Sequence, residues 1–161
     1  PLPFKSVLIT GPFMPKNKRR KIFKRARKLG VRGYHFYRQM EKVFAAADIV
    51  VSMGGYNTLC EILGQGTLSL VIPRETPRQE QIIRARAFHQ QNLVDYIPWY
   101  QCSPQTMGEK VAALLADASE YREAIARFPM NGIVEMRKRL VAFNGKDSID
   151  HYRSSRLRVV S

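Results

Sequence analysis

The stretch from residue 48 to residue 61 constrains the fold more than any other part of the chain. It reads Asp-Ile-Val-Val-Ser-Met-Gly-Gly-Tyr-Asn-Thr-Leu-Cys-Glu. A short apolar run is typical of a buried strand, and two glycines directly after it allow a sharp turn into a helix. The first N–H groups of such a helix have no partner within the helix, and its positive dipole end favours an anion. The pattern therefore predicts a strand, a tight turn and a helix with an anion site at its start.

A purely structural interpretation of this turn is also open. Paired glycines can simply relieve crowding, and Asn57 or Thr58 can serve as an ordinary N-cap. In the ligand-binding interpretation, backbone N–H groups, an amide and a hydroxyl hold the diphosphate of a nucleotide. The candidate binding residues of the turn are then Ser52, Gly54, Gly55, Tyr56, Asn57 and Thr58.

The size of the chain fits one globular domain. It has 161 residues and a hydrophobic content of 45%, enough for a substantial core. No apolar run approaches the ~20 residues that cross a bilayer. Two cysteines and three histidines lack metal-ligand spacing, so we expect no metal and a reducing cytoplasmic location. No cofactor is expected either. The first residues carry neither an initiator Met nor a signal-peptide pattern, which leaves open that the chain is a fragment.

Positive charge is concentrated in one segment. The net charge is +14, and residues 16 to 28 hold nine basic residues without an acidic one. Ile22, Ala26 and Leu29 recur there at helical spacing, which predicts an amphipathic helix with a basic face. Such a face attracts nucleic acid, anionic lipid headgroups or phosphorylated substrates, or it is only a solvated surface.

Strand and helix patterns alternate along the chain, which predicts the α/β class. Such alternation implies right-handed crossovers and a doubly wound parallel sheet of about five strands. We expect one domain over residues 1–130, followed by a C-terminal helix and basic tail over 131–161. The predicted strands are 6–10, 31–37, 49–52, 67–72 and 93–97, and the predicted helices are 16–29, 38–47, 57–63, 79–90 and 103–115.

Ligands of doubly wound sheets bind beyond the carboxyl ends of the strands. The polar segments after Thr10, Ser52 and Pro73 all fall at that edge. We therefore expect them to line one site. Gly11, at the end of the first strand, is a further candidate to approach phosphates.

Two separated motifs resemble the donor-binding half of GT-B glycosyltransferases. The stretch 55–61 looks like the Gly-Trp-Asn-Ser-x-x-Glu part of the plant glycosyltransferase signature box, and Glu80-Gln81, nineteen residues after Glu61, looks like its terminal Asp/Glu-Gln pair. The layout around them is similar to the carboxyl-terminal domain of bacterial lipid-linked N-acetylglucosaminyltransferases. A group of predicted bacterial glycosyltransferases shares the Ser-Met-Gly-Gly-Tyr-Asn-Thr turn. The resemblance covers about residues 5 to 116.

The resemblance implies roles for further side chains. Glu61 would accept hydrogen bonds from the ribose hydroxyls, although a carboxylate that favours the helix dipole is the structural alternative. Glu80 and Gln81 would bind the hydroxyls of a hexose, although a plain surface dipeptide is also open. Tyr37 and the backbone from Arg38 onward would hold the base, with a core aromatic as the alternative for Tyr37.

One departure from the plant box changes the expected chemistry. Met53 stands where that box has a histidine before the glycines. No imidazole is then available for the β-phosphate. Backbone dipoles, or a basic residue such as Arg74 or Arg78, would have to stabilise its charge.

The function implied by the resemblance is donor binding in an inverting, metal-independent transferase. The donor would be a UDP-linked or similar nucleotide hexose. We expect no catalytic residue in this chain, because GT-B enzymes carry the acceptor site and the base on an amino-terminal domain. Expected partners are therefore the donor, that missing domain and, through the basic helix, an anionic membrane surface, with a peripheral location.

Two other functions are weighed beside this one. A nucleic-acid-binding module would use the basic residues together with aromatic residues, but no recognised RNA- or DNA-binding motif appears, so nucleic acid is not the expected partner. A UDP-sugar epimerase of the same two-domain architecture would use the same diphosphate site. The aromatic residues concerned are Phe23, Tyr34, Phe36 and Tyr37.

Overall fold

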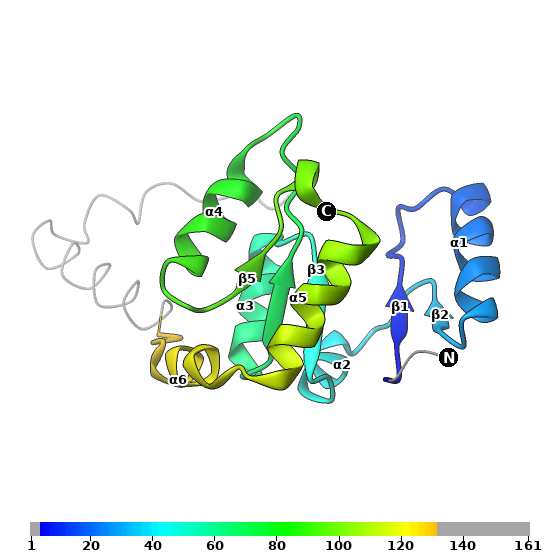
Figure 1. The fold of residues 1–161 in the computed structure, drawn as a ribbon. Helices are drawn as coiled ribbons and strands as arrows, with labels where there is room; N and C mark the ends of the chain where they lie inside the picture. Colours follow the sequence, from blue (N-terminus) through cyan, green and yellow to red (C-terminus); the bar gives the residue numbers. More distant parts are fainter. Residues whose placement is uncertain (1–3, 132–161) are drawn as a thin grey trace, which may run out of the picture.

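The computed structural model describes residues 4–131 (Figure 1). The predicted C-terminal helix and basic tail lie outside the described residues, except for Asn131. The elements are β1 (Val7–Ile9), α1 (Lys16–Lys28), β2 (Arg32–Tyr34), α2 (Met40–Ala45), β3 (Ile49–Ser52), α3 (Tyr56–Gly64), β4 (Leu68–Val71), α4 (Glu80–His89), β5 (Asp95–Tyr96), the 3₁₀ turn η1 (Trp99–Gln101), α5 (Pro104–Ala116) and α6 (Ser119–Arg127).

The α/β class and the order of the elements are confirmed, but the strands form two sheets. β1 pairs with β2, and β4 lies between β3 and β5; every pair is parallel. The second strand is shorter than predicted, because only Arg32–Tyr34 pair with β1. The described residues thus contain a two-stranded and a three-stranded sheet rather than one sheet of five.

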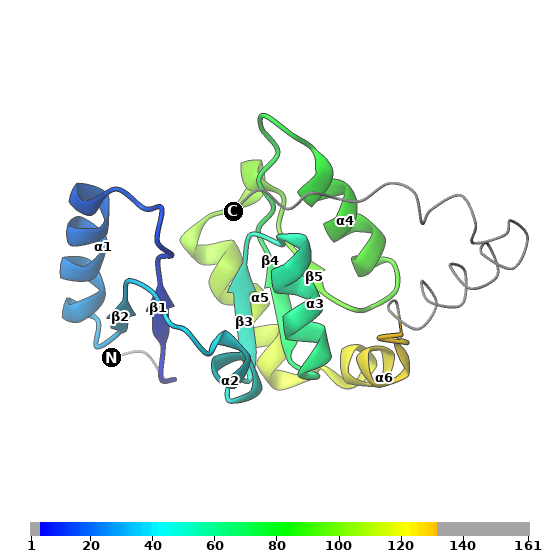
Figure 2. The ribbon, with the colours of Figure 1, turned by 180° about the vertical axis from the view of Figure 1, so that it is seen from behind.

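The three-stranded sheet carries helices on both faces. α3 lies in front of it in Figure 2, whereas α5 lies in front in Figure 1. β4 is buried along its whole length, as its continuous apolar run predicts. The predicted cap of α5 is confirmed: the Ser103 hydroxyl accepts a hydrogen bond from the Thr106 N–H at 3.0 Å.

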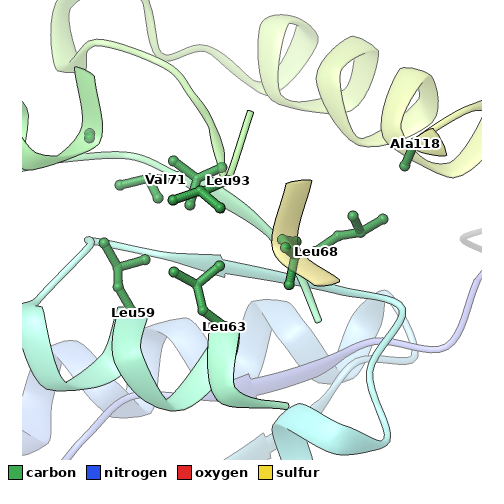
Figure 3. Packing of buried hydrophobic residues seen from close by; sticks show 9 residues of the cluster. Leu59, Leu63, Leu68, Val71, Leu93 and Ala118 are labelled. Carbon is green, nitrogen blue, oxygen red and sulfur yellow. The ribbon is translucent and has the colours of Figure 1, made fainter. Parts of the chain in front are cut away.

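A hydrophobic core joins α3 to this sheet (Figure 3). Leu59 and Leu63 project from one side of α3 toward Leu68 and Val71 of β4, and all four side chains are buried. Their spacing of four residues places Leu59 and Leu63 on the same face of the helix. This packing sets the position of α3, and therefore of its amino-terminal end.

The first βαβ unit is built differently. α1 lies against β2, where the Phe23 ring covers Gly33 so closely that a Cβ there would meet the ring at 2.7 Å. As predicted, α1 ends before a glycine: Gly30 adopts a positive φ of 74°. Ala26 is the only buried residue between residues 4 and 39. This unit therefore has almost no core of its own.

An ion pair between a buried carboxylate of β5 and a lysine of α5 connects these two elements. The Asp95 side chain is 6% exposed, and its carboxylate lies 2.8 Å from the Lys110 ammonium. A buried carboxylate needs such a partner, because its charge is poorly solvated. Burial raises the pKa of the nearby Tyr121 hydroxyl, and the negative charges of Asp95 and Glu120 raise this pKa further.

Candidate functional site

The turn between β3 and α3 requires glycine at its first position. Gly54 has a φ of +73°, and a Cβ on it would lie 2.6 Å from Cγ1 of Val71. Both the backbone conformation and the space exclude a side chain. The Gly54 N–H also donates a hydrogen bond to the Ser52 hydroxyl at 3.3 Å. The backbone of the turn therefore packs on Val71 of β4 and is hydrogen-bonded to Ser52 of β3.

The start of α3 has no side-chain cap. Gly55 is its N-cap residue, so Asn57 and Thr58 lie inside the helix and the interpretation of either as an ordinary N-cap is wrong. The first helical hydrogen bond runs from the Leu59 N–H to the Gly55 carbonyl at 2.9 Å. The N–H groups of the three preceding residues have no helical acceptor. The helix begins at Tyr56, one residue earlier than predicted.

Arg84 of α4 joins this turn, and the sequence did not identify it. Its guanidinium donates a hydrogen bond to the Gly54 carbonyl at 2.9 Å and lies 5.5 Å from the centroid of the Tyr56 ring. The side chain is half-buried, and the Gly54 carbonyl and the Tyr56 ring together restrain the position of its guanidinium. One feature of the sequence could have indicated Arg84 as a site residue. It lies three residues after Gln81 and therefore on the same face of α4.

Glu61 lies further along α3 from the turn. Its side chain is exposed, and no hydrogen bond or ion pair within residues 4–131 engages its carboxylate. Two acceptor oxygens are therefore available to a ligand near the start of α3. The role of Glu61 stays a prediction.

The Glu80-Gln81 pair begins α4, as predicted to within one residue, but its two members differ. Oε1 of Gln81 accepts a hydrogen bond from the Arg74 N–H at 2.9 Å and so stabilises the loop after β4. The amide nitrogen of Gln81 retains its donors. Glu80, Arg74 and Arg78 are exposed.

The remaining predicted site residues belong to the β1–β2 unit. Gly11 has a φ of +76°, and a Cβ there would have no neighbour within 4 Å. Tyr37 is 38% exposed, and its ring lies in a T-shaped arrangement with that of Tyr34, so it is not a core aromatic. In the described part of the chain, no hydrogen bond or ion pair connects Gly11, Tyr37 or Arg38 with the β3–α3 turn.

Residues 4–131 contain neither a candidate metal site nor a candidate membrane-spanning helix. No group of three or more His, Cys, Asp or Glu side chains is placed to hold a metal ion. None of the helices described has the length and apolar character that a membrane span requires.

The sequence matches one family over most of its length. The profile of the glycosyltransferase family 28 C-terminal domain matches residues 3–140. The UDP-N-acetylglucosamine--N-acetylmuramyl-(pentapeptide) pyrophosphoryl-undecaprenol N-acetylglucosamine transferase of Lachnoclostridium phytofermentans is 30% identical over 99 residues, 60% of this chain and 28% of the relative. The enzyme of the same name from Streptococcus uberis is 32% identical over 82 residues, 50% of this chain and 23% of the relative. The chain thus spans about a quarter of these relatives.

Solved structures show the same fold. The calicheamicin glycosyltransferase CalG4 superimposes with a TM-score of 0.63 at 18% identity, over 92% of this chain and 44% of that one. MurG of Acinetobacter baumannii superimposes with a TM-score of 0.61 at 12% identity, over 83% of this chain and 49% of that one. At these identities the similarity concerns the fold alone.

The packing of Gly54 on Val71 predicts an unequal response to alanine at two glycines. Gly66 also has a positive φ, but a Cβ on it would have no neighbour within 4 Å. Gly66→Ala should therefore cost only the backbone strain, about 1 kcal/mol. Gly54→Ala adds overpacking against Val71 and should cost about 2–4 kcal/mol in free energy of unfolding, measured by urea denaturation. Equal losses in the two variants would show that the turn tolerates a side chain.

Proposed function

Because the chain belongs to the glycosyltransferase family 28 C-terminal domain family, we propose that it binds the nucleotide-sugar donor of a glycosyltransferase, with the donor diphosphate at the start of α3. The observation that carries this proposal is the uncapped end of α3 beside the guanidinium of Arg84. Unpaired N–H groups and a fixed positive charge together favour the diphosphate of a nucleotide sugar, which carries one negative charge on each phosphate.

In this proposal the site stabilises the leaving group. As the bond from the sugar to the diphosphate breaks, negative charge grows on the diphosphate. Donors already held in place need no reorganisation to stabilise it. The N–H groups of Tyr56, Asn57 and Thr58 would supply the dipoles, and Arg84 would supply the full charge that Met53 cannot.

The two ends of the donor would contact different side chains. Glu61 would accept hydrogen bonds from the ribose hydroxyls, and the base would lie near Tyr37 and Arg38. Glu80 would accept, and the amide nitrogen of Gln81 would donate, hydrogen bonds to a hexose. The names of the bacterial relatives specify a UDP-linked N-acetylhexosamine, which supports a UDP-linked donor here.

The reaction would proceed with inversion and without a metal ion. The basic group that deprotonates the acceptor hydroxyl would come from another domain. The same relatives are named for an undecaprenol-linked acceptor, which is a membrane lipid. We therefore propose that the basic face of α1 holds the enzyme on an anionic membrane surface. All its basic residues are exposed except the half-buried Arg19.

Arg84→Gln should weaken UDP binding, measured by isothermal titration calorimetry. A lost charge-assisted hydrogen bond costs about 1.5–3 kcal/mol, so affinity should fall about 10- to 100-fold. Uridine, which has no diphosphate, should bind both proteins equally. The matched control is Arg86→Gln, an exposed arginine on the same helix. Unchanged UDP affinity in a folded Arg84→Gln protein would remove Arg84 from the site.

Glu61→Gln should act on the ribose alone. Affinity for UDP should fall about tenfold, because an amide offers one acceptor oxygen where the carboxylate offers two. Affinity for 2′,3′-dideoxy-UDP should be nearly the same in the wild-type chain and the variant. An equal loss for both nucleotides would contradict ribose recognition and indicate a general effect on the helix.

Removing charge from α1 should release the protein from anionic vesicles. Each basic residue near the headgroups contributes about 1 kcal/mol, so four substitutions to Gln should lower partitioning by more than about 100-fold in a co-sedimentation assay. Added salt should weaken the wild-type binding. Indifference to lipid charge would contradict the membrane proposal. The test variant changes Lys21, Lys24, Arg25 and Lys28, and the control changes Lys42, Arg86, Arg122 and Arg127, all of which are exposed.

A further inference from the structure

The loop between β1 and α1 exposes a phenylalanine almost completely. Phe13 is 97% exposed, the largest fraction among the large hydrophobic side chains of residues 4–131. Its ring in water forgoes the free energy that burial would give. Exposure alone identifies no partner, because single apolar residues are common on protein surfaces. The surroundings of Phe13 do identify one.

The loop that carries Phe13 is restrained. It reads Gly-Pro-Phe-Met-Pro, and its two prolines each fix a φ angle. The guanidinium of Arg19 donates a hydrogen bond to the Met14 carbonyl at 3.3 Å, which attaches the loop to the first turn of α1. A loop held in this way loses little conformational entropy when its exposed ring enters a partner.

The part of the chain around this loop contains only positive charge. Residues 1–40 hold twelve lysines and arginines and no aspartate or glutamate, so they supply +12 of the net charge of +14. Among residues 4–131, none of these basic side chains forms an ion pair. Charge of one sign over a whole unit attracts an extended anionic surface.

The cations nearest to Phe13 in the sequence lie where a helix disfavours them. Lys16, Lys18 and Arg19 are in the first turn of α1, which has neither an acidic residue nor a side-chain cap. The helix dipole adds partial positive charge at this end, so these side chains repel it and one another. Phosphate groups next to the first turn would remove this repulsion. The charge pattern therefore favours an anionic partner beside the Phe13 loop.

A lipid bilayer offers both features that this end of the unit lacks. Its headgroups carry phosphate, and an apolar region lies directly beneath them. Nucleic acid also offers phosphate, but it binds along grooves in which several aromatic rings stack on successive bases. One ring at the tip of a loop, beside a basic helix, matches the layered chemistry of the bilayer better.

We propose that the β1–α1 loop inserts Phe13 among the lipid chains of an anionic membrane while the basic residues of α1 contact the headgroups. This inference rests on the membrane attachment proposed above and adds the point of insertion. In Figures 1 and 2 the β1–α1 loop and the start of α3 lie at the same, upper end of the molecule. Insertion therefore turns the candidate donor site toward the bilayer, which charge attraction alone does not do.

Partitioning onto vesicles of phosphatidylcholine and phosphatidylglycerol tests the insertion. Phe13→Ser should lower partitioning about tenfold or more, because the burial of the ring is lost. The matched control is Leu29→Ser, which changes a 61% exposed side chain at the opposite end of α1 and should bind like the wild-type chain. An equal loss in the two variants would mean that α1 lies flat on the bilayer and would overturn insertion at the loop.

A fluorescence probe in the loop reports insertion directly. Trp99 is the only tryptophan of the chain, so Phe13→Trp combined with Trp99→Phe leaves a single indole at position 13. Its emission should shift to shorter wavelength on the anionic vesicles and should be quenched by lipids with brominated chains. A shift with single-stranded RNA and none with vesicles would assign the loop to nucleic acid and overturn the proposal.

Failure of the insertion can be told apart from failure of the membrane attachment. A wild-type chain that does not bind anionic vesicles contradicts the attachment, and the insertion with it. Salt-sensitive binding of the wild-type chain, with no effect of Phe13→Ser and no emission shift, overturns the insertion alone. Phe13→Ser should bind UDP like the wild-type chain. Weaker UDP binding with unchanged partitioning would place Phe13 in the donor site and overturn its insertion.

Discussion

The contact of Gly54 with Val71 is the constraint on which the rest of the candidate site depends. Because no side chain fits there, the backbone can turn directly above β4 and enter α3 without a spacer. Leu59 and Leu63 then hold α3 against the same strand. The carbonyl of Gly54 is left pointing to α4, where Arg84 binds it. One close backbone approach therefore sets both the direction of the helix dipole and the position of the nearby charge.

Features encoded by neighbouring residues were predictable from the sequence. The burial of β4 follows from its unbroken apolar run, and the start of α5 follows from Ser103 and Pro104, whose effects act within one turn. The β3–α3 turn was likewise predictable, since two glycines after an apolar strand restrict the chain locally. The family assignment rests on the same short segments, and the match over residues 3–140 agrees with it.

Features that depend on distant residues were not predictable in this way. The bond from Arg84 to Gly54 joins residues thirty positions apart, and it depends on how α4 packs beside the turn. The hydrogen bond from the Arg74 N–H to Gln81 likewise arises only when the loop after β4 folds back. The division of the strands into two sheets is also non-local, because strand patterns predict that strands exist but not which edges pair.

The difference between Arg84 and the loop arginines explains why one of them suits the stabilisation of a developing charge. Arg74 and Arg78 are exposed, so water and salt screen their charges and their side chains must be ordered when a ligand binds. Arg84 is half-buried and already held by a carbonyl and an aromatic ring. Its remaining N–H donors are therefore oriented before any ligand arrives. A charge held in this way interacts more strongly with an adjacent phosphate than a mobile one in the loop, since less of its energy is lost to ordering and screening.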